Sequence, residues 1–446
     1  MQTINELKAY LDAKENNDIH PSELVKVLKE LDEYNFADAI QLIPKEFIGD
    51  IALSLPDRYF GDIIESLELE DLTEALKELE SDDQTDFMQE LHEHDEQVAS
   101  KLFETLDKED QVDIIKLKNY EESEAGSYMQ TEVFTAHRDE TVQDVVNNFA
   151  QLKKSHELEN VHTLFITKRN NELWYSIALE NLLIFDFSKT LRENITNSTE
   201  SFEPKVAHER EDIKEVVHYF EEYDLTVIPV VDHHNILLGR ITSDDIYDII
   251  NEHATEQMYH LAGVDDEAEE DEEILKAGKK RASWLGVNLV TAILASLIIG
   301  LFAETIESIV ALAILMPIVA SMGGNAGTQT LTVVVRQLAL RDISQRDATR
   351  IIKKELGISF LNGLLFAIIM GTIASFWFEK GLLLGVVIAL SMLINLIMAG
   401  LFGATIPLFL KKMNVDPAIG STVILTTVTD IVGFFSFLGL ATIILL

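Results

Sequence analysis

The chain has 446 residues, no cysteine, and 76 acidic against 35 basic residues, a formal net charge of -41 at pH 7. The lack of cysteine excludes disulfides, thiolate metal sites and cysteine nucleophiles. The negative charge disfavours a nucleic-acid partner, because a polyanion would be repelled. Residues 1–275 hold 68 acidic and 22 basic residues, whereas residues 276–446 hold 8 and 13, so an acidic first part precedes a nearly charge-free second part.

Residues 1–125 are predicted to be an acidic helical domain. Its first residues lack the basic and apolar segments of a cleaved signal peptide, so we expect this part to lie in the cytosol. Prolines at 21, 44 and 56 separate short segments in which leucine and isoleucine recur on one face. Short helices with one apolar face each favour a stacked superhelix, and a plain helical bundle is the alternative.

From residue 126 to 252 strands alternate with helices. The clearest unit has a helix over 216–223, a β-branched strand over 226–231, a second strand over 236–241 and a helix from Asp244. This order, with the sequence GRITSDD, resembles a CBS module. Residues 129–183 resemble a degraded first copy, so the section is predicted to be a tandem of α/β CBS modules.

Tandem CBS modules form a pseudo-twofold disc and often bind adenosine nucleotides. In the first module Asn181 stands where the family has an aspartate that would hold a nucleotide ribose. This replacement argues against ATP as a ligand, and a purely structural pair is the alternative. Residues 253–282 then join the two parts of the chain as a predicted connecting helix and acidic linker.

Five segments of the second part are free of charge except for Asp430, and they cover residues 284–303, 308–335, 356–378, 381–410 and 417–446. A helix needs about 20 apolar residues to cross a bilayer, so each segment can span once. We therefore predict a transmembrane domain with five spans over residues 283–446.

Lysine and arginine predict the orientation of these spans. Of the 13 basic residues after residue 275, 12 lie before span 1, between spans 2 and 3, or between spans 4 and 5. The positive-inside rule places these segments in the cytoplasm of a bacterial-type plasma membrane, with the N-terminus inside and the C-terminus outside. Residues 304–307 and 379–381 are then short outer loops, and residues 344–354 are predicted to lie along the inner face as an amphipathic helix.

Span 2 contains an unusual polar motif after Pro317. Non-helical backbone at membrane depth occurs only where it is buried in protein or lines a water-filled path. We therefore expect a break in this helix along an ion path, whose candidate lining residues are Gly323, Gly324, Asn325, Gly327 and Gln329. The alternative is a packing notch of the GxxxG kind, made by Gly323 and Gly327.

Span 5 carries Asp430, the only charge within the five predicted spans. A carboxylate at mid-bilayer is costly and marks a functional site. Thr422 and Thr426 precede it by eight and four residues, so all three share one face of a helix. Oxygen ligands without histidine or cysteine favour a hard cation such as Mg2+ or Ca2+ over Zn2+ or copper.

Three motifs together resemble the MgtE family of magnesium transporters: Pro317 followed by GGNAGTQ, DPA at 416–418, and TVTDIVGF around Asp430. The resemblance covers essentially the whole chain. It implies a homodimeric Mg2+ channel in the membrane lipid, with its pore between spans 2 and 5 of both subunits. It also implies that Asp430 forms the central ion site beside Thr426 and Thr422, and that the cytosolic part closes the pore when internal Mg2+ is plentiful.

The resemblance further points to cytosolic Mg2+ sensor residues, namely Glu70, Glu74, Asp245, Asp248 and Glu256. His253 and Gln257 stand where the family has carboxylates in the connecting helix, and Glu252 or the acidic run at 265–273 could substitute for them. Facing acidic surfaces in a dimer repel one another unless divalent cations lie between them, so low Mg2+ favours their separation. The alternative is that the acidity serves solubility alone.

Other functions remain open at this point. A carrier coupled to Na+ or H+, or an importer of Co2+ or Mn2+, would share the spans and their polar motifs. A membrane-anchored CBS sensor without transport would not need the polar residues of spans 2 and 5. An enzyme is not expected, because the spans contain no HExxH, paired aspartates or nucleophile–base motif.

Overall fold

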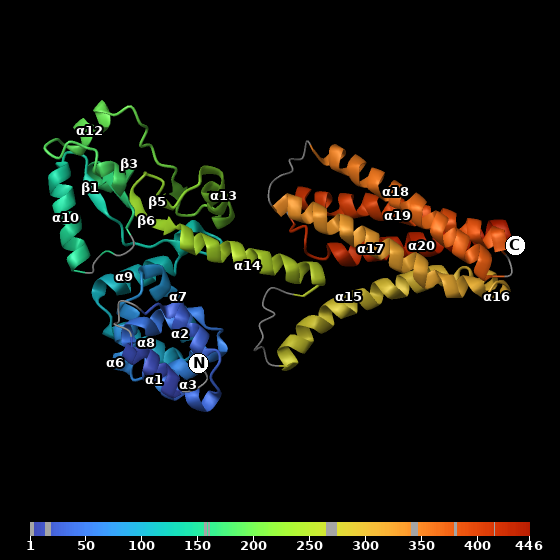
Figure 1. Cartoon of the computed structure of the whole chain (residues 1–446), viewed down its shortest axis with the longest axis horizontal. Helices are drawn as coiled ribbons and strands as arrows, with labels where there is room; N and C mark the ends of the chain where they lie inside the picture. Colours follow the sequence, from blue (N-terminus) through green and yellow to red (C-terminus); the bar gives the residue numbers. More distant parts are fainter. Residues whose placement is uncertain are drawn as a thin grey trace. The chain divides into compact units, whose positions relative to one another are not determined.

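The computed structural model describes residues 4–13, 19–155, 158, 161–264, 274–339, 347–378, 381–413 and 415–446. They belong to two compact units, Met1–Asn251 and Glu252–Leu446, which are described separately (Figure 1). The acidic run at 265–273, residues 344–346 of the predicted amphipathic helix, and residues 379 and 380 of a predicted outer loop lie outside the described residues.

The first unit begins with a helical domain in which helices two apart along the chain pack together: α2 with α4, α3 with α5, α4 with α6, and α6 with α8. Leucine, isoleucine and phenylalanine side chains from one face of each helix form its core. This arrangement agrees with the predicted stacking of short amphipathic helices. The helices are α1 (Ile4–Ala13), α2 (Pro21–Leu28), α3 (Glu33–Ile40), α4 (Ile48–Ser54), α5 (Arg58–Ser66), α6 (Leu69–Lys77), α7 (Ser81–His94), α8 (Glu96–Thr105) and α9 (Lys108–Leu117), with the short 3-10 helix η2 (Lys45–Phe47).

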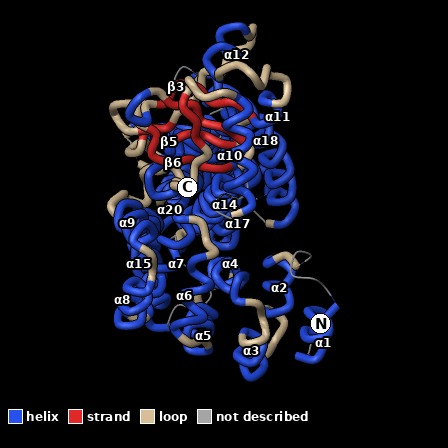
Figure 2. The backbone as a smooth tube through the Cα atoms, turned by 90° about the vertical axis from the view of Figure 1, so that its left-hand side faces the viewer, coloured by secondary structure: helices blue, strands red, loops and turns tan. Residues whose placement is uncertain are grey.

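Two three-stranded sheets follow, and they have the same topology. Figure 2 shows their strands in red. In each sheet the first strand is parallel to the second, and the second is antiparallel to the third. The first module contains β1 (Thr135–His137), α10 (Val142–Lys154), β2 (Thr163–Thr167), β3 (Leu173–Ala178), α11 (Leu179–Leu182) and α12 (Leu191–Asn197). The second contains β4 (Ala207–His208), α13 (Ile213–Tyr223), β5 (Val227–Val231), β6 (Leu237–Thr242) and the start of α14 (Ser243–Ala262). The predicted tandem of α/β modules is therefore confirmed.

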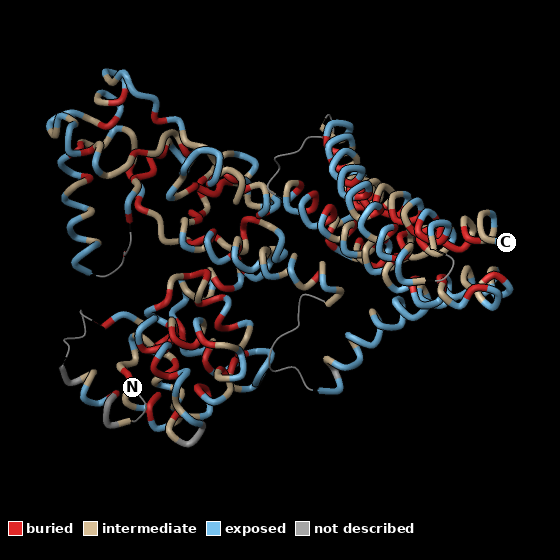
Figure 3. The backbone as a smooth tube through the Cα atoms, turned by 45° about the vertical axis from the view of Figure 1, so that its right-hand side comes forward, coloured by how far each residue is buried: buried red, intermediate tan, exposed pale blue. Residues whose placement is uncertain are grey.

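The second unit contains five helices that are long and apolar enough to cross a membrane, which confirms the predicted number of spans within the described residues. They are α15 (Ile274–Gly300), α17 (Ala311–Ala339), α18 (Ala348–Trp377), α19 (Gly381–Lys412) and α20 (Ser421–Leu445). Helix α19 packs against α17, α18 and α20, whereas α15 packs against α20 and remains exposed along most of its length (Figure 3).

Residues 304–307, predicted to be a short connection between spans, belong to a short helix, α16 (Ala303–Ser308), between α15 and α17. Two other local predictions in this unit are wrong. The described residues 348–354 are the first turns of α18, so they continue the spanning helix and form no separate amphipathic helix. Helix α17 also runs without interruption through residues 323–329, because the glycines there keep helical backbone angles and two of them, Gly323 and Gly327, pack against neighbouring helices.

Candidate ion path and cytosolic carboxylate cluster

Helix α20 carries the predicted stripe of oxygen ligands. Thr422, Thr426 and Asp430 lie four residues apart, and each side chain is half-buried. The Thr426 hydroxyl donates to the carbonyl of Thr422 at 3.0 Å, so it is held by its own helix. The Asp430 carboxylate makes no hydrogen bond or ion pair with the residues that the structure describes. Its oxygens are therefore available to an ion or to water.

Helix α17 divides its polar motif between two faces. Gly323 and Gly327 are buried, and a Cβ atom at Gly327 would lie 3.0 Å from the Leu425 side chain of α20. This face is the packing notch considered above. Asn325 and Gln329 are instead exposed, and a Cβ atom at Gly324 would meet no other atom within 4 Å. The two amides therefore lie on an open face of the single chain.

This division makes a prediction for the α17 motif. Asn325→Leu is expected to block transport while the protein still folds and inserts, because the side chain is exposed and its replacement disturbs no packing. Gly324→Leu is expected to behave in the same way. Gly323→Leu is expected to prevent folding, because its side chain would overlap a buried neighbour. Ion flux and gel-filtration profiles of the three variants check this, and normal flux in both Asn325→Leu and Gly324→Leu would remove the open face from the ion path.

Two buried polar residues of the membrane domain escaped the sequence analysis. Glu355 of α18 is 6 % exposed and accepts a hydrogen bond from the Thr330 hydroxyl of α17 at 3.2 Å. It was missed because the predicted span began one residue later. Asn395 of α19 is fully buried against α17. It is the only amide side chain in residues 381–410, so the sequence did contain a signal for it.

The connecting helix ends against the start of α20 within the second unit. The Thr422 hydroxyl donates to the carbonyl of Leu261 in α14 at 2.9 Å. His260 Nδ1 lies 3.9 Å from Asp416 Oδ2, and Asp416 also accepts from the backbone N–H of Ala418 at 2.7 Å. The first threonine of the predicted stripe is therefore bonded directly to the connecting helix.

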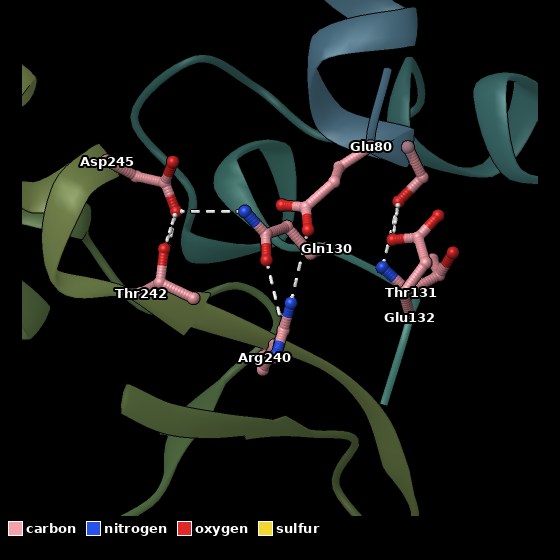
Figure 4. A network of polar contacts seen from close by, with 8 residues as sticks. Glu80, Gln130, Thr131, Glu132, Arg240, Thr242 and Asp245 are labelled. Atoms are coloured by element: carbon pink, nitrogen blue, oxygen red, sulfur yellow. Dashed lines mark hydrogen bonds and ion pairs between the residues drawn. The ribbon is translucent and has the colours of Figure 1, made fainter. Parts of the chain in front are cut away.

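In the first unit, a cluster of carboxylates lies where the start of α7 meets the second CBS module. Figure 4 shows two of them, Glu80 and Asp245. We call Glu80, Asp82, Asp83 and Asp245 the carboxylate cluster. Arg240 lies among them and places one guanidinium nitrogen 3.4 Å from Glu80. Gln130 links the Arg240 and Asp245 side chains, at 3.0 and 3.5 Å. The cluster joins acids from the N domain to an acid at the start of α14.

Burial and like charge raise the pKa of every member of this cluster. Burial, as the largest cause, raises the pKa of Glu80 to about 7, that of Asp83 to about 7 and that of Asp245 to about 6. Burial and the neighbouring Asp245 raise the pKa of Asp82 well above its ordinary value, and its Oδ1 is buried without a hydrogen-bond partner in the described part of the chain. Negative charge at this junction is therefore costly unless protons or cations accompany it.

These pKa values predict how the stability of the first unit depends on pH. Because folding raises the carboxyl pKa values, the folded state binds more protons, so stability falls as pH rises from about 4.5 to about 7. Residues 19–251 in EDTA should therefore melt at a lower temperature at pH 8 than at pH 6, and Mg2+ should restore much of the difference. Glu80→Gln/Asp83→Asn should weaken this dependence. A melting temperature that rises over this pH range would contradict the prediction.

The other predicted sensor residues are distributed differently. Asp248 is close enough to Asp245 to raise its pKa. Glu70 and Glu74 are exposed on α6, and neither is among the charges that most affect the pKa of a cluster member. Glu256 bonds His253 at 2.9 Å, and both it and the exposed Glu252 belong to the second unit. Among the described residues, no three histidine or acidic side chains are already arranged to hold a metal ion.

Of the cluster, only Asp245 was predicted, together with its charged neighbour Asp248. Glu80, Asp82 and Asp83 are ordinary acidic residues of a highly acidic chain, and about 160 residues separate them from Asp245. Only folding brings them together, so no local pattern could have singled them out.

Comparison with known proteins decides the family. A family model described as divalent cation transporter matches residues 316–440, the MgtE intracellular N domain matches 19–123, and the CBS domain matches 199–252. The magnesium transporter MgtE of Thermus thermophilus is 30% identical over 356 residues, which cover 79% of this chain and 76% of that protein. The chain belongs to the MgtE family. The MgtE of Bacillus subtilis is also 30% identical, over 73% of this chain and 70% of its own length.

Two solved structures match about half of this MgtE-family chain. The cytosolic domain of the Mg2+ channel MgtE in complex with ATP is 24% identical over 55% of this chain and 99% of that chain, with a TM-score of 0.49. The soluble part of a magnesium transporter covers 56% of this chain and 99% of its own, at 21% identity and a TM-score of 0.40. The match of the CBS family model to residues 199–252 falls on the second, better preserved module.

Proposed function

We propose that this MgtE-family transporter conducts Mg2+ as a homodimeric channel whose ion path runs between α17 and α20 of both copies. The observation that carries this proposal is the unpaired Asp430 carboxylate, on one face of α20 with Thr426 and Thr422. A charge at membrane depth is retained for function, because its insertion is costly. Mg2+ prefers oxygen ligands and keeps much of its water, so a carboxylate with hydroxyls and carbonyls nearby suits a hydrated ion.

The open face of α17 supports an ion path formed by two copies of the chain. Asn325 and Gln329 are exposed, and Asn325 lies 3.4 Å from the Ser321 hydroxyl, itself exposed. Amides that faced lipid would leave hydrogen bonds unmet, whereas amides that face an aqueous path in a dimer are satisfied by water. The face therefore suits an ion path between two copies better than contact with lipid.

The carboxylate cluster supports gating by cytosolic Mg2+. When internal Mg2+ is low, buried like charges oppose the contact between α7 and the second CBS module. A divalent cation that binds there offsets the repulsion and favours the compact arrangement, which we propose is the closed state. Several such sites can shift the equilibrium together even when each has modest affinity.

The membrane orientation follows from the same proposal. The sensor must meet cytosolic Mg2+, so the N-terminus and both CBS modules lie in the cytoplasm and the C-terminus lies outside. The basic residues Arg336, Arg350, Lys411 and Lys412 at the helix ends agree with this orientation under the positive-inside rule. The membrane is the plasma membrane of a bacterial cell.

Ion flux into liposomes tests the function. Purified protein is expected to carry Mg2+ at a rate that varies with an imposed voltage and needs no Na+ or H+ gradient. A strict need for either gradient would identify a carrier instead. Faster flux of Co2+ or Mn2+ than of Mg2+ would change the substrate, and no flux of any divalent cation would favour a membrane-anchored sensor.

A further inference from the structure

Asn395 places a fully buried amide at the centre of the membrane domain. Its helix, α19, contributes none of the residues proposed for the ion path, but it packs against both helices that do. The surrounding residues of α19 are almost all apolar. An amide at such a position is unfavourable unless its hydrogen bonds are made, so its contacts show what it holds in place.

Asn395 contacts α17 through a hydrogen bond and a glycine. Its Nδ2 donates to the carbonyl of Val319 at 2.9 Å. One turn later, a Cβ atom at Gly323 would lie 2.2 Å from the same nitrogen, a distance that no side chain could occupy. Gly323 of the polar motif is therefore needed for this contact.

The same amide contacts α20. A Cβ atom at Gly433 would lie 2.8 Å from Asn395 Nδ2. Gly433 lies three residues after Asp430, and Gly323 lies two residues before Asn325. One side chain of α19 thus fills the space left by two glycines, and each glycine is less than one helical turn from a residue proposed for the ion path.

The amide is not explained by packing alone. Its Oδ1 is buried and has no hydrogen-bond partner among the described residues. An apolar side chain of similar volume would fill the same space without leaving a polar atom unmet. The amide adds a directional contact, because its hydrogen bond to Val319 fixes the rotation of α17 about its own axis.

We propose that Asn395 is a positioning residue that sets the rotation of α17 and α20 and so determines the preference for Mg2+ over Ca2+. This inference rests on the proposed ion path between these two helices. Mg2+ demands near-octahedral oxygens, in the protein or in its own water shell, whereas Ca2+ accepts a looser and more variable arrangement. A small rotation of either helix therefore weakens the selection of Mg2+ more than it weakens conduction itself.

Paired Mg2+ and Ca2+ flux measurements in liposomes test the proposal. In Asn395→Leu, the ratio of Mg2+ to Ca2+ flux is expected to fall about tenfold, the change expected from one buried hydrogen bond. The control is Ser391→Ala, one turn earlier in α19, whose fully buried hydroxyl bonds the carbonyl of Ile388 in its own helix. Its ratio should stay within about twofold of wild type.

Variants of Gly433 and Asn395, whose atoms are in close contact, provide an independent measurement in the full-length protein. Gly433→Ala should lower both the flux ratio and the melting temperature, because its methyl group would meet Asn395. Adding Asn395→Ala should restore the melting temperature by removing the clash, while the flux ratio stays low because the hydrogen bond is gone. This pair also serves if Asn395→Leu fails to fold.

The outcomes separate the possible failures. An unchanged flux ratio in folded Asn395→Leu, or an equal loss of both fluxes, would overturn the positioning role and leave the proposed transport intact. Additive melting temperatures in the Gly433 pair would overturn the contact itself. Absence of Mg2+ flux in the wild type would instead overturn the proposed function, and the positioning role with it.

Discussion

Replacement of Asp430 by alanine is expected to reduce Mg2+ flux by on the order of a hundredfold, equivalent to about 2.7 kcal/mol at the ion site. The carboxylate is the charge that the ion meets in the proposed path, and no other described residue pairs with it. The variant should still fold and insert, because removing a charge makes a membrane helix more apolar. Radiometric or fluorescent Mg2+ uptake into liposomes, at equal amounts of inserted protein, measures the effect.

The matched control for this variant is Ser436→Ala. Ser436 lies on the same helix at similar burial, and its hydroxyl bonds the carbonyl of Gly433 in its own helix. Its flux should remain within about twofold of wild type. Wild-type flux in Asp430→Ala would exclude this residue from the ion path, whereas equal losses in both variants would indicate a general disturbance of α20.

Loss of the response to internal Mg2+ is the second large effect, and it is expected when the carboxylate cluster is neutralised. In Asp82→Asn/Asp245→Asn, flux should be low at every internal Mg2+ concentration. The two amides remove the buried like charges that a cation would otherwise offset, so the compact, closed arrangement no longer needs Mg2+. Removal of residues 1–250 should also abolish the response, but with flux that stays high, since the second compact unit begins at Glu252. In the Asp82→Asn/Asp245→Asn variant, protease cleavage of the first unit should no longer slow when Mg2+ is added.

Glu70→Gln/Glu74→Gln provides the comparison for the cluster variant. It makes the same change in net charge at two exposed residues of α6 that are not members of the cluster. If charge at the junction is what senses Mg2+, this variant should close like wild type. Loss of closure in the α6 variant alone would move the sensor to that helix, and closure of the truncated protein would exclude the first unit as the sensor.

Much of the membrane domain could be predicted from the sequence because its signals are local. The length of a charge-free segment alone decides whether it can span a bilayer, and residues four apart on a helix share a face. Those rules gave the five spans and the alignment of Thr422, Thr426 and Asp430. The uninterrupted course of α17 did not follow from them, since glycine and asparagine favour a break only where neighbouring helices do not hold the segment.

The residues missed were those whose roles arise from tertiary contacts. Glu355 is meaningful only because α18 begins seven residues before it and buries it against Thr330. Asp82 resembles the many other acidic residues in the sequence, and only the contact between α7 and the second CBS module distinguishes it. Conversely, Glu70 and Glu74 were predicted from a resemblance alone, and the fold leaves both exposed.

The hydrogen bond between Thr422 and the connecting helix has a mechanical consequence. Helix α20 is continuous from Ser421 to Leu445 and contains no proline, so it transmits displacement as a stiff rod. Thr422 and Asp430 are eight residues apart, about 12 Å along the axis at 1.5 Å per residue. No loop or hinge of the described chain separates Leu261 from the Asp430 carboxylate, so a displacement of the connecting helix would be passed along α20 to the proposed ion site. The distance from Thr422 to that carboxylate is little more than two turns of helix.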